Sequence, residues 1–173
     1  MKTFIKSAMI ASLALGVAGY GAGSVPSEAM AQTRSEPAKS SALPDSIRNA
    51  AIKGQASGKV AGARIGNTDF FVVYVKSTGL CGSAGCRAQI WAREGSKYVR
   101  KQSLPVGYLP VSVLPQSDKG MPRLGISVDD ENLRPATLVV AFDGKNYSLS
   151  DWDNLLPANA GKVIVSDKML KSF

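Results

Sequence analysis

The sequence predicts a single, mainly-β domain of the α+β class: an antiparallel β-meander preceded by one short helix. Two observations predict it. From Asp69 onward, short apolar or alternating segments recur between turn-forming residues, as in an antiparallel sheet. Before Asp69, only residues 46–55 carry apolar residues at helical spacing. No repeat of fixed period and no second domain is indicated, so residues 44–173 are predicted to form one globular domain.

The first 31 residues have the order of a secretory signal peptide. Basic Lys2 and Lys6 precede the apolar run 8–17, and a small-x-small site ends at Ala31, which places cleavage between Ala31 and Gln32. The apolar run is too short to span a bilayer. We therefore expect a periplasmic or secreted protein with no membrane span in its mature form and no nucleic acid among its partners.

The composition is basic and lacks histidine. The whole chain has 21 Lys and Arg against 13 Asp and Glu, a net charge of +8. Without Lys2, Lys6 and Glu28 of the leader, 19 minus 12 leaves +7. This excess favours an acidic protein or an anionic envelope component as partner. The absence of histidine excludes Ser-His-Asp and Cys-His catalysis and removes the commonest zinc ligand, so no catalytic residue, metal or cofactor is predicted.

The segment after the leader is expected to be a tether followed by the helix. Residues 32–43 are rich in Ser, Pro, Ala and Lys and resemble a flexible linker. A helix over residues 46–55 would begin with Asp45 or Ser46 as N-cap and stop before Gly58.

Several strands are expected after the helix. Residues 70–75 form a continuous apolar run, typical of a central strand with both faces covered. The other expected strands are 88–93, 98–100, 109–113, 124–128, 138–142, 147–149 and 163–165.

Faces and turns follow from the same pattern. In the 88–93 strand, the small and aliphatic residues lie on one face, and Gln89, Trp91 and Arg93 lie on the other. Three prolines at positions 105, 110 and 115 confine the 109–113 segment to an edge or an irregular strand. Asp143-Gly144 favours a type I′ hairpin turn.

Cys81 and Cys86 lie five positions apart, separated only by Gly, Ser and Ala. In an oxidising compartment this short loop predicts a disulfide between them. A redox-active pair would need Cys-x-x-Cys at the start of a helix, whereas the segment after Cys86 is predicted to be a strand.

The chain resembles a group of small, largely uncharacterised bacterial periplasmic proteins. The likeness lies in the Pro-x-x-Ile-Arg-x-Ala helix within residues 43–51, the Cys-Gly-x-x-Gly-Cys loop within 70–91, and the segment 111–126. Such proteins often carry an acidic Asp-x-Asp-Gly turn before the first strand, where this chain has Gly66 to Asp69. The resemblance implies an exported interaction domain in a β-meander and implies no reaction.

A basic and aromatic hairpin is the leading candidate for a binding surface. Arginine and aromatic side chains are the usual anchors of protein interfaces, and this hairpin also carries Arg87. An ordinary solvated hairpin with Trp91 packed beneath it is the alternative. The residues predicted to contact a partner are Trp91, Arg93, Lys97, Tyr98, Arg100 and Lys101.

Two acidic segments offer other chemistry. Residues 129–132 could ligate calcium but lack the ordered spacing of a calcium loop, so a solvated turn is favoured. Asp151 and Asp153 could serve glycoside hydrolysis, although adjacent carboxylates more often cap a short helix.

The leading hypothesis is a non-enzymatic periplasmic binding protein, such as an inhibitor or immunity-type partner of an envelope-acting enzyme. One alternative is an accessory component of a secretion or conjugation assembly in the envelope. A cell-wall or carbohydrate hydrolase using Asp151 and Asp153 is the other.

Overall fold

The computed structural model describes residues 42–150 and 155–173. The expected signal peptide, residues 32–41 of the expected tether, and the pair Asp151 and Asp153 lie outside the described residues. Among the described residues, no helix is long and apolar enough to cross a membrane.

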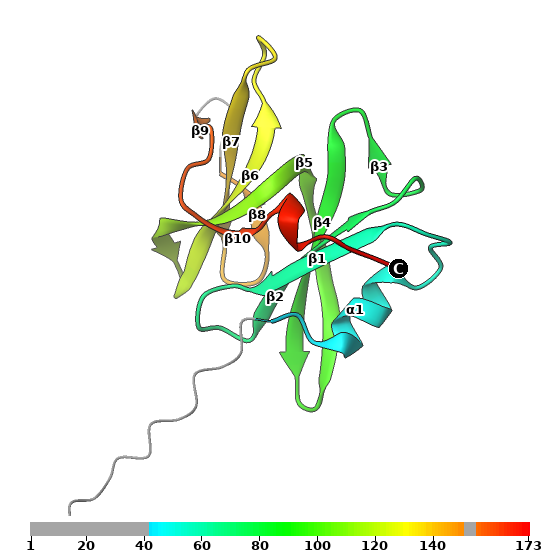
Figure 1. Cartoon of the computed structure of the whole chain (residues 1–173). Coiled ribbons are helices and arrows are strands. Elements are labelled where there is room, and N and C mark those ends of the chain that lie inside the picture. Colours follow the sequence, from blue (N-terminus) through cyan, green and yellow to red (C-terminus); the bar gives the residue numbers. More distant parts are fainter. Residues whose placement is uncertain (1–41, 151–154) are drawn as a thin grey trace, which may run out of the picture. The chain divides into compact units, whose positions relative to one another are not determined.

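The described chain is an antiparallel meander with one short helix, which confirms the predicted fold class (Figure 1). The main sheet has the order β11-β1-β2-β4-β5-β6-β7-β8, while β3 pairs with β4, β9 with β7 and β10 with β5. The elements are α1 (Asp45–Ile52), β1 (Lys59–Arg64), β2 (Phe70–Lys76), β3 (Cys81–Gly82), β4 (Gly85–Glu94), β5 (Lys97–Asp118), β6 (Met121–Asp129), β7 (Pro135–Phe142), β8 (Tyr147–Leu149), β9 (Leu156–Pro157), β10 (Lys162–Val165), the 3-10 helix η1 (Asp167–Met169) and β11 (Lys171–Ser172).

Strand β5 is 22 residues long and joins two halves of the sheet. Its first half pairs with β4, and its second half pairs with β6 on one side and β10 on the other. The predicted irregularity is present, but the strand is central rather than at an edge. Pro105, Pro110 and Pro115 all fall where the pairing register shifts, so their missing N–H groups remove no regular ladder bond.

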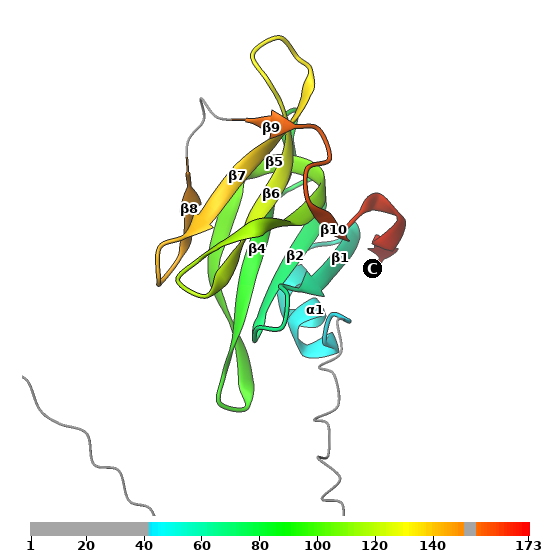
Figure 2. The same ribbon diagram turned by 90° about the vertical axis from the view of Figure 1, so that its left-hand side faces the viewer.

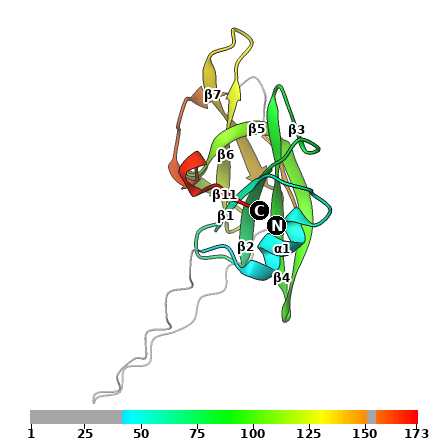
Figure 3. The ribbon, with the colours of Figure 1, turned by 45° about the vertical axis from the view of Figure 1, so that its right-hand side comes forward.

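Strand β2 is covered on both faces, as predicted for residues 70–75. Val72 and Tyr74 point into the main core, which contains side chains from β1, β2, β4, β5, β6, β7, β8 and β10. Phe71, Val73 and Val75 point into a second core, together with Ile47. Helix α1 lies over this core, against β2 (Figure 3). The helix therefore stiffens one face of the β1-β2-β4 region.

The beginning of the domain differs from the prediction. Helix α1 starts at Asp45 and ends at Ile52; Pro44 occupies the N-cap, and neither Asp45 nor Ser46 provides a side-chain cap. The expected tether ends earlier than residue 43, because Ala42 forms an isolated bridge with Ala63 and Leu43 packs on the core under α1.

Strand β1 was not expected, because Lys-Val-Ala-Gly-Ala-Arg has only one β-branched residue and no aromatic residue to indicate a strand. Its small residues are explained by close packing. A Cβ atom on Gly62 would lie 2.7 Å from the backbone oxygen of Val72 and 3.1 Å from the side chain of Leu43.

The predicted β7–β8 hairpin is present, but its turn is not of type I′. Four residues separate the paired Phe142 and Tyr147, and Asp143 accepts hydrogen bonds from the backbone N–H groups of Lys145 and Asn146, both at 2.7 Å. A type I′ turn needs two adjacent residues with positive φ, but Gly144 has a positive φ while neither Asp143 nor Lys145 does. The Asp143 side chain thus organises the turn.

The predicted disulfide is confirmed. Cys81 and Cys86 form a cross-strand pair between β3 and β4, with an S–S distance of 2.08 Å. It closes the loop that connects β2 to β4.

The close approach at Gly62 can be tested by adding one methyl group. Gly62→Ala should lower the free energy of unfolding by about 1–3 kcal/mol, because the backbone oxygen of Val72 has to move. Urea denaturation followed by circular dichroism measures the change. Gly82→Ala is the control: a Cβ there meets nothing within 4 Å, so the change should stay within about 0.5 kcal/mol. Equal effects of the two substitutions would contradict the packing described for β1.

Candidate interaction surface

The hairpin predicted to bind a partner is formed by β4 and β5 and projects at one end of the sheet (Figure 2). Glu94 and Lys97 are its last regular pair, and Gly95 and Ser96 make the turn. Gly95 adopts a φ of 59°, in the left-handed region that glycine reaches without strain. A two-residue turn therefore connects β4 to β5.

Strand pairing gathers four of the six predicted residues on one face of the hairpin. Trp91 lies opposite Arg100, and Arg93 lies opposite Tyr98. Directly opposed residues in an antiparallel pair place their side chains on the same face. This face is the one that α1 covers further along the sheet, because Trp91 belongs to the core under the helix. We call the surface formed by Arg93, Tyr98 and Arg100 the arginine face.

The other two predicted residues lie on the opposite face. Lys97 pairs with Glu94, and the ammonium group of Lys101 forms an ion pair with the carboxylate of Glu94. Lys101 occupies a register shift, since Arg100 and Gln102 pair with consecutive residues of β4. The six residues predicted to contact a partner are thus divided between the two faces of the hairpin. On the face that carries Lys97 and Lys101, the carboxylate of Glu94 partly neutralises the positive charge.

Trp91 forms part of the core and offers little surface to a partner. Its relative exposure is 7%, and its indole N–H donates a hydrogen bond of 3.0 Å to the side-chain oxygen of Gln89. Phe71 lies beside it on β2. The ring of Tyr98 meets the ring of Phe71 edge-on, with centroids 5.5 Å apart. The expected contact role of Trp91 is therefore replaced by a supporting one beneath the arginine face.

A fourth strand extends this aromatic support. Arg64 of β1 pairs with Phe71, and its guanidinium lies over the Phe71 ring at 4.6 Å from the centroid. It also forms an ion pair of 3.3 Å with Asp69, and its side chain is only 11% exposed. A row from Arg64 through Phe71 and Trp91 to Arg100 thus crosses four strands. Arg64 was not predicted to belong to this surface, because strand β1, which carries it, was not predicted.

Arg93 and Arg100 are the exposed charges of the arginine face. The Nε of Arg93 donates a hydrogen bond of 3.1 Å to the backbone oxygen of Gly95. Neither guanidinium has an acidic partner among residues 42–150 and 155–173. Arg87 is exposed two positions before Gln89, so strand alternation places it on the same side. The surface is cationic, and its charges are not used within the described part of the chain.

An acidic loop joins β6 to β7 at the other end of the sheet (Figure 1). The Asp130 carboxylate accepts hydrogen bonds from the backbone N–H groups of Asn132 (2.8 Å) and Arg134 (2.9 Å) and forms an ion pair of 3.0 Å with the Arg134 guanidinium. The backbone hydrogen bond from Arg134 is the largest of the effects that lower the pKa of Asp130. Leu133 follows with a φ of 59° and 83% exposure.

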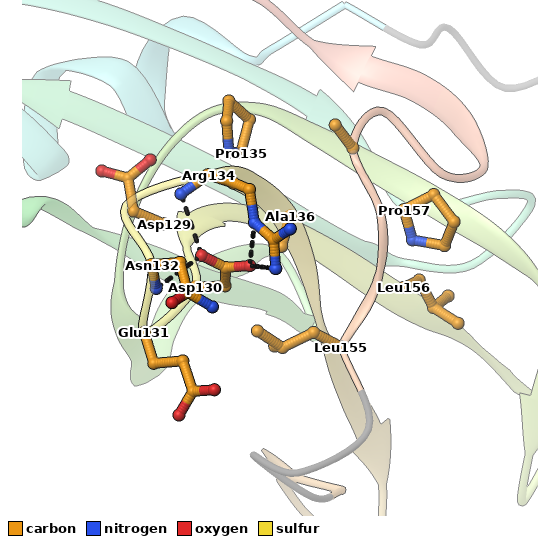
Figure 4. Close-up of a pocket in the computed structure, with 11 residues that line it drawn as sticks. Asp129, Asp130, Glu131, Asn132, Arg134, Pro135, Ala136, Leu155, Leu156 and Pro157 are labelled. Carbon is orange, nitrogen blue, oxygen red and sulfur yellow. Dashed lines mark hydrogen bonds and ion pairs between the residues drawn. The ribbon is translucent and has the colours of Figure 1, made fainter.

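This loop borders a hollow with a cavity volume of about 880 Å³ (Figure 4). Asp129 and Glu131 lie on its acidic side, and Leu155, Leu156 and Pro157 form its apolar side. In the part of the chain that the structure describes, no group of three or more histidine, cysteine, aspartate or glutamate residues could hold a metal ion. The Asp130 hydrogen bonds to the backbone of Asn132 and Arg134 organise the loop at residues 129–132 as a turn.

Comparison with known proteins returned no match to any family model, curated protein or solved structure.

Because Trp91 is buried beneath the arginine face, removing its side chain should lower the stability of the fold much more than removing an exposed side chain of that face. Trp91→Ala should lower the free energy of unfolding by about 3–5 kcal/mol, because it empties a buried site between Phe71 and Gln89. Arg100→Ala, on the exposed side of the same pair, should change it by no more than about 0.5 kcal/mol. Chemical denaturation followed by circular dichroism measures both. A Trp91→Ala variant as stable as Arg100→Ala would mean that the indole is not part of the core.

The low pKa of Asp130 predicts acid loosening of the β6–β7 loop. Because the folded pKa is lower than the ordinary value of about 3.9, the loop's contribution is present above that value and is lost as the pH falls through the folded pKa. The amide resonances of Asn132 and Arg134 should therefore shift together below about pH 4. An NMR titration observes this, and Asp130→Asn should remove the transition. A transition that persists in that variant would assign it to another carboxylate.

Proposed function

We propose that this chain is a non-enzymatic, exported binding protein that uses the β4–β5 hairpin to hold an acidic partner protein. One observation carries the proposal: Arg93 and Arg100 are exposed on the arginine face and have no acidic partner among the described residues. Charges placed in this way steer an oppositely charged partner and select it over others.

The support beneath these charges makes the surface suited to binding. The ring of Tyr98 packs edge-on against Phe71, and the indole of Trp91 is held by its hydrogen bond to Gln89. The part of β5 that carries Arg100 therefore has little freedom to move. A surface that is already ordered loses less conformational entropy when a partner binds. The half-buried ring of Tyr98, which is opposite Arg93 and two residues from Arg100, adds apolar contact area to the same face.

Export is supported by the cysteines and by the first residues of the sequence. The Cys81–Cys86 disulfide persists in oxidising compartments such as the periplasm, where glutathione does not reduce it. Residues 1–31 have the composition of a leader. The absence of histidine from the sequence is the reason for proposing binding rather than catalysis.

Charge reversal tests the proposal. The double change Arg93→Glu with Arg100→Glu should weaken retention of the partner from periplasmic extract at least about tenfold, because like charges then face each other across the interface. The thermal midpoint should stay nearly unchanged, since both side chains are exposed. Immobilised protein and quantitative mass spectrometry of the bound fraction provide the measurement.

The control reverses two exposed lysines on other turns, Lys119→Glu with Lys145→Glu, and changes net charge by the same amount. It should retain the partner like the wild type. Equal loss in both variants would mean that net charge alone governs binding, and the arginine face would then not be the site. A single soluble enzyme in the bound fraction would identify an inhibitor or immunity-type role. A set of membrane components would identify an accessory of an envelope assembly.

A further inference from the structure

The two hairpins at the ends of the sheet carry opposite, unused charge. At the β4–β5 end, Arg93 and Arg100 are exposed without an acidic partner among the described residues. At the β6–β7 end, Asp129 and Glu131 are exposed and have no ion pair in residues 42–150 and 155–173. Asp130 differs from these two carboxylates because Arg134 and backbone N–H groups already satisfy it.

The shapes of the two ends are complementary as well. The β4–β5 end is a narrow, projecting hairpin whose turn has only two residues (Figure 2). The β6–β7 end borders the hollow of about 880 Å³ (Figure 4). In that close-up, the carboxylates of Asp129 and Glu131 extend away from the Asp130–Arg134 pair, and Leu155 lies across from the loop. A projecting cationic hairpin and an acidic hollow with an apolar side complement each other in both charge and form.

The two ends cannot meet within one molecule. The β4–β5 turn and the β6–β7 loop lie at opposite ends of the sheet in all three ribbon views (Figures 1, 2 and 3). A contact between them therefore joins two molecules. Such a contact uses different surfaces on the two copies, so each copy keeps one free hairpin or one free hollow.

We propose that a partner of the arginine face is a second copy of this chain, whose hollow beside Asp129 and Glu131 receives the β4–β5 hairpin. This inference rests on the proposed function, because it gives the acidic partner an identity. One hairpin tip in one open hollow makes a small contact, and contacts smaller than roughly 1,200 Å² are typical of weak, transient association. We therefore expect an association that depends on concentration. The product is a head-to-tail dimer that lengthens as concentration rises.

Sedimentation velocity on the purified protein tests this without any other component. At about 0.1 M salt the weight-average mass should rise with protein concentration. Reversal of the hairpin charges, Arg93→Glu with Arg100→Glu, should weaken association at least about tenfold, and so should reversal of the hollow, Asp129→Lys with Glu131→Lys. The variant Lys119→Glu with Lys145→Glu is the control and should associate like the wild type.

Mixing the two reversed variants gives the sharpest result. The hollow variant keeps an intact hairpin, and the hairpin variant keeps an intact hollow. Each should sediment as a monomer alone, and an equimolar mixture should associate. The intact hairpin of one variant then meets the intact hollow of the other, and the two reversed surfaces again carry opposite charges. Circular dichroism and the thermal midpoint check that each variant is folded. A mixture that remains monomeric, while the wild type associates, would assign self-association to another surface and overturn the inference.

The inference and the proposed function fail in different ways. If the wild type stays monomeric at the highest concentration while hairpin reversal still abolishes retention of a periplasmic protein, the second copy is excluded and the binding role of the arginine face stands. If hairpin reversal changes neither self-association nor retention, the arginine face is not a binding surface and both proposals fall.

Discussion

The passage of β5 from one half of the sheet to the other is the constraint on which the rest of the structure depends. A single strand pairs first with β4 and then with β6, and the main core fills the space that both halves line. Regular pairing over all 22 residues would keep the two halves in one continuous ladder. Instead, Pro105, Pro110 and Pro115 each coincide with a register shift, and these irregular points let the ladder change direction. Gln102 of β5 stabilises the same region. Its side-chain oxygen accepts a hydrogen bond of 2.7 Å from the backbone N–H of Tyr147, and its side-chain N–H donates one of 2.6 Å to the backbone oxygen of Tyr147. These two hydrogen bonds occupy the outer edge of β8.

The position of the hairpins follows from this arrangement. β4 and β5 leave the main core before their turn: Ile90 is the last residue of β4 in that core, and Arg93 and Glu94 are exposed. On one side α1 and the aromatic residues give this extension a second, smaller core, which ends with Tyr98 against Phe71. The exposed guanidinium groups stand just past that support. A cationic surface at this place is thus stiff at its base and solvated at its tip.

Sequence reasoning worked where local pattern decides structure and failed where packing between distant segments decides it. The apolar run of β2, the alternation of β4 and β6, and the short Cys81–Cys86 loop are local signals, and the structure has each of them. Strand β1 was missed because its small residues are selected by contact with Val72 and Leu43 rather than by strand propensity. The burial of Trp91 depends on a helix forty residues earlier in the chain, so alternation could assign its face but not its exposure. The basic residues of the hairpin lie on two different faces, partly because Lys101 is an extra residue in the pairing between β4 and β5. A register shift of this kind cannot be predicted from the pattern of residue types.

The net positive charge of the chain makes it possible to distinguish two partners of the arginine face, a second copy of this chain and a different, acidic protein. Two copies that each carry a large net positive charge repel at long range, while the contact between hairpin and hollow attracts over a few ångströms. Because the Debye length is about 30 Å at 0.01 M salt and about 10 Å at 0.1 M, repulsion between whole molecules fades first as salt is added. The local attraction fades only near 1 M, where the Debye length is about 3 Å. Self-association through this contact is therefore strongest at intermediate salt. An acidic partner protein is attracted at both ranges, so its binding weakens steadily with salt, and the dependence on ionic strength distinguishes the second copy from a different protein.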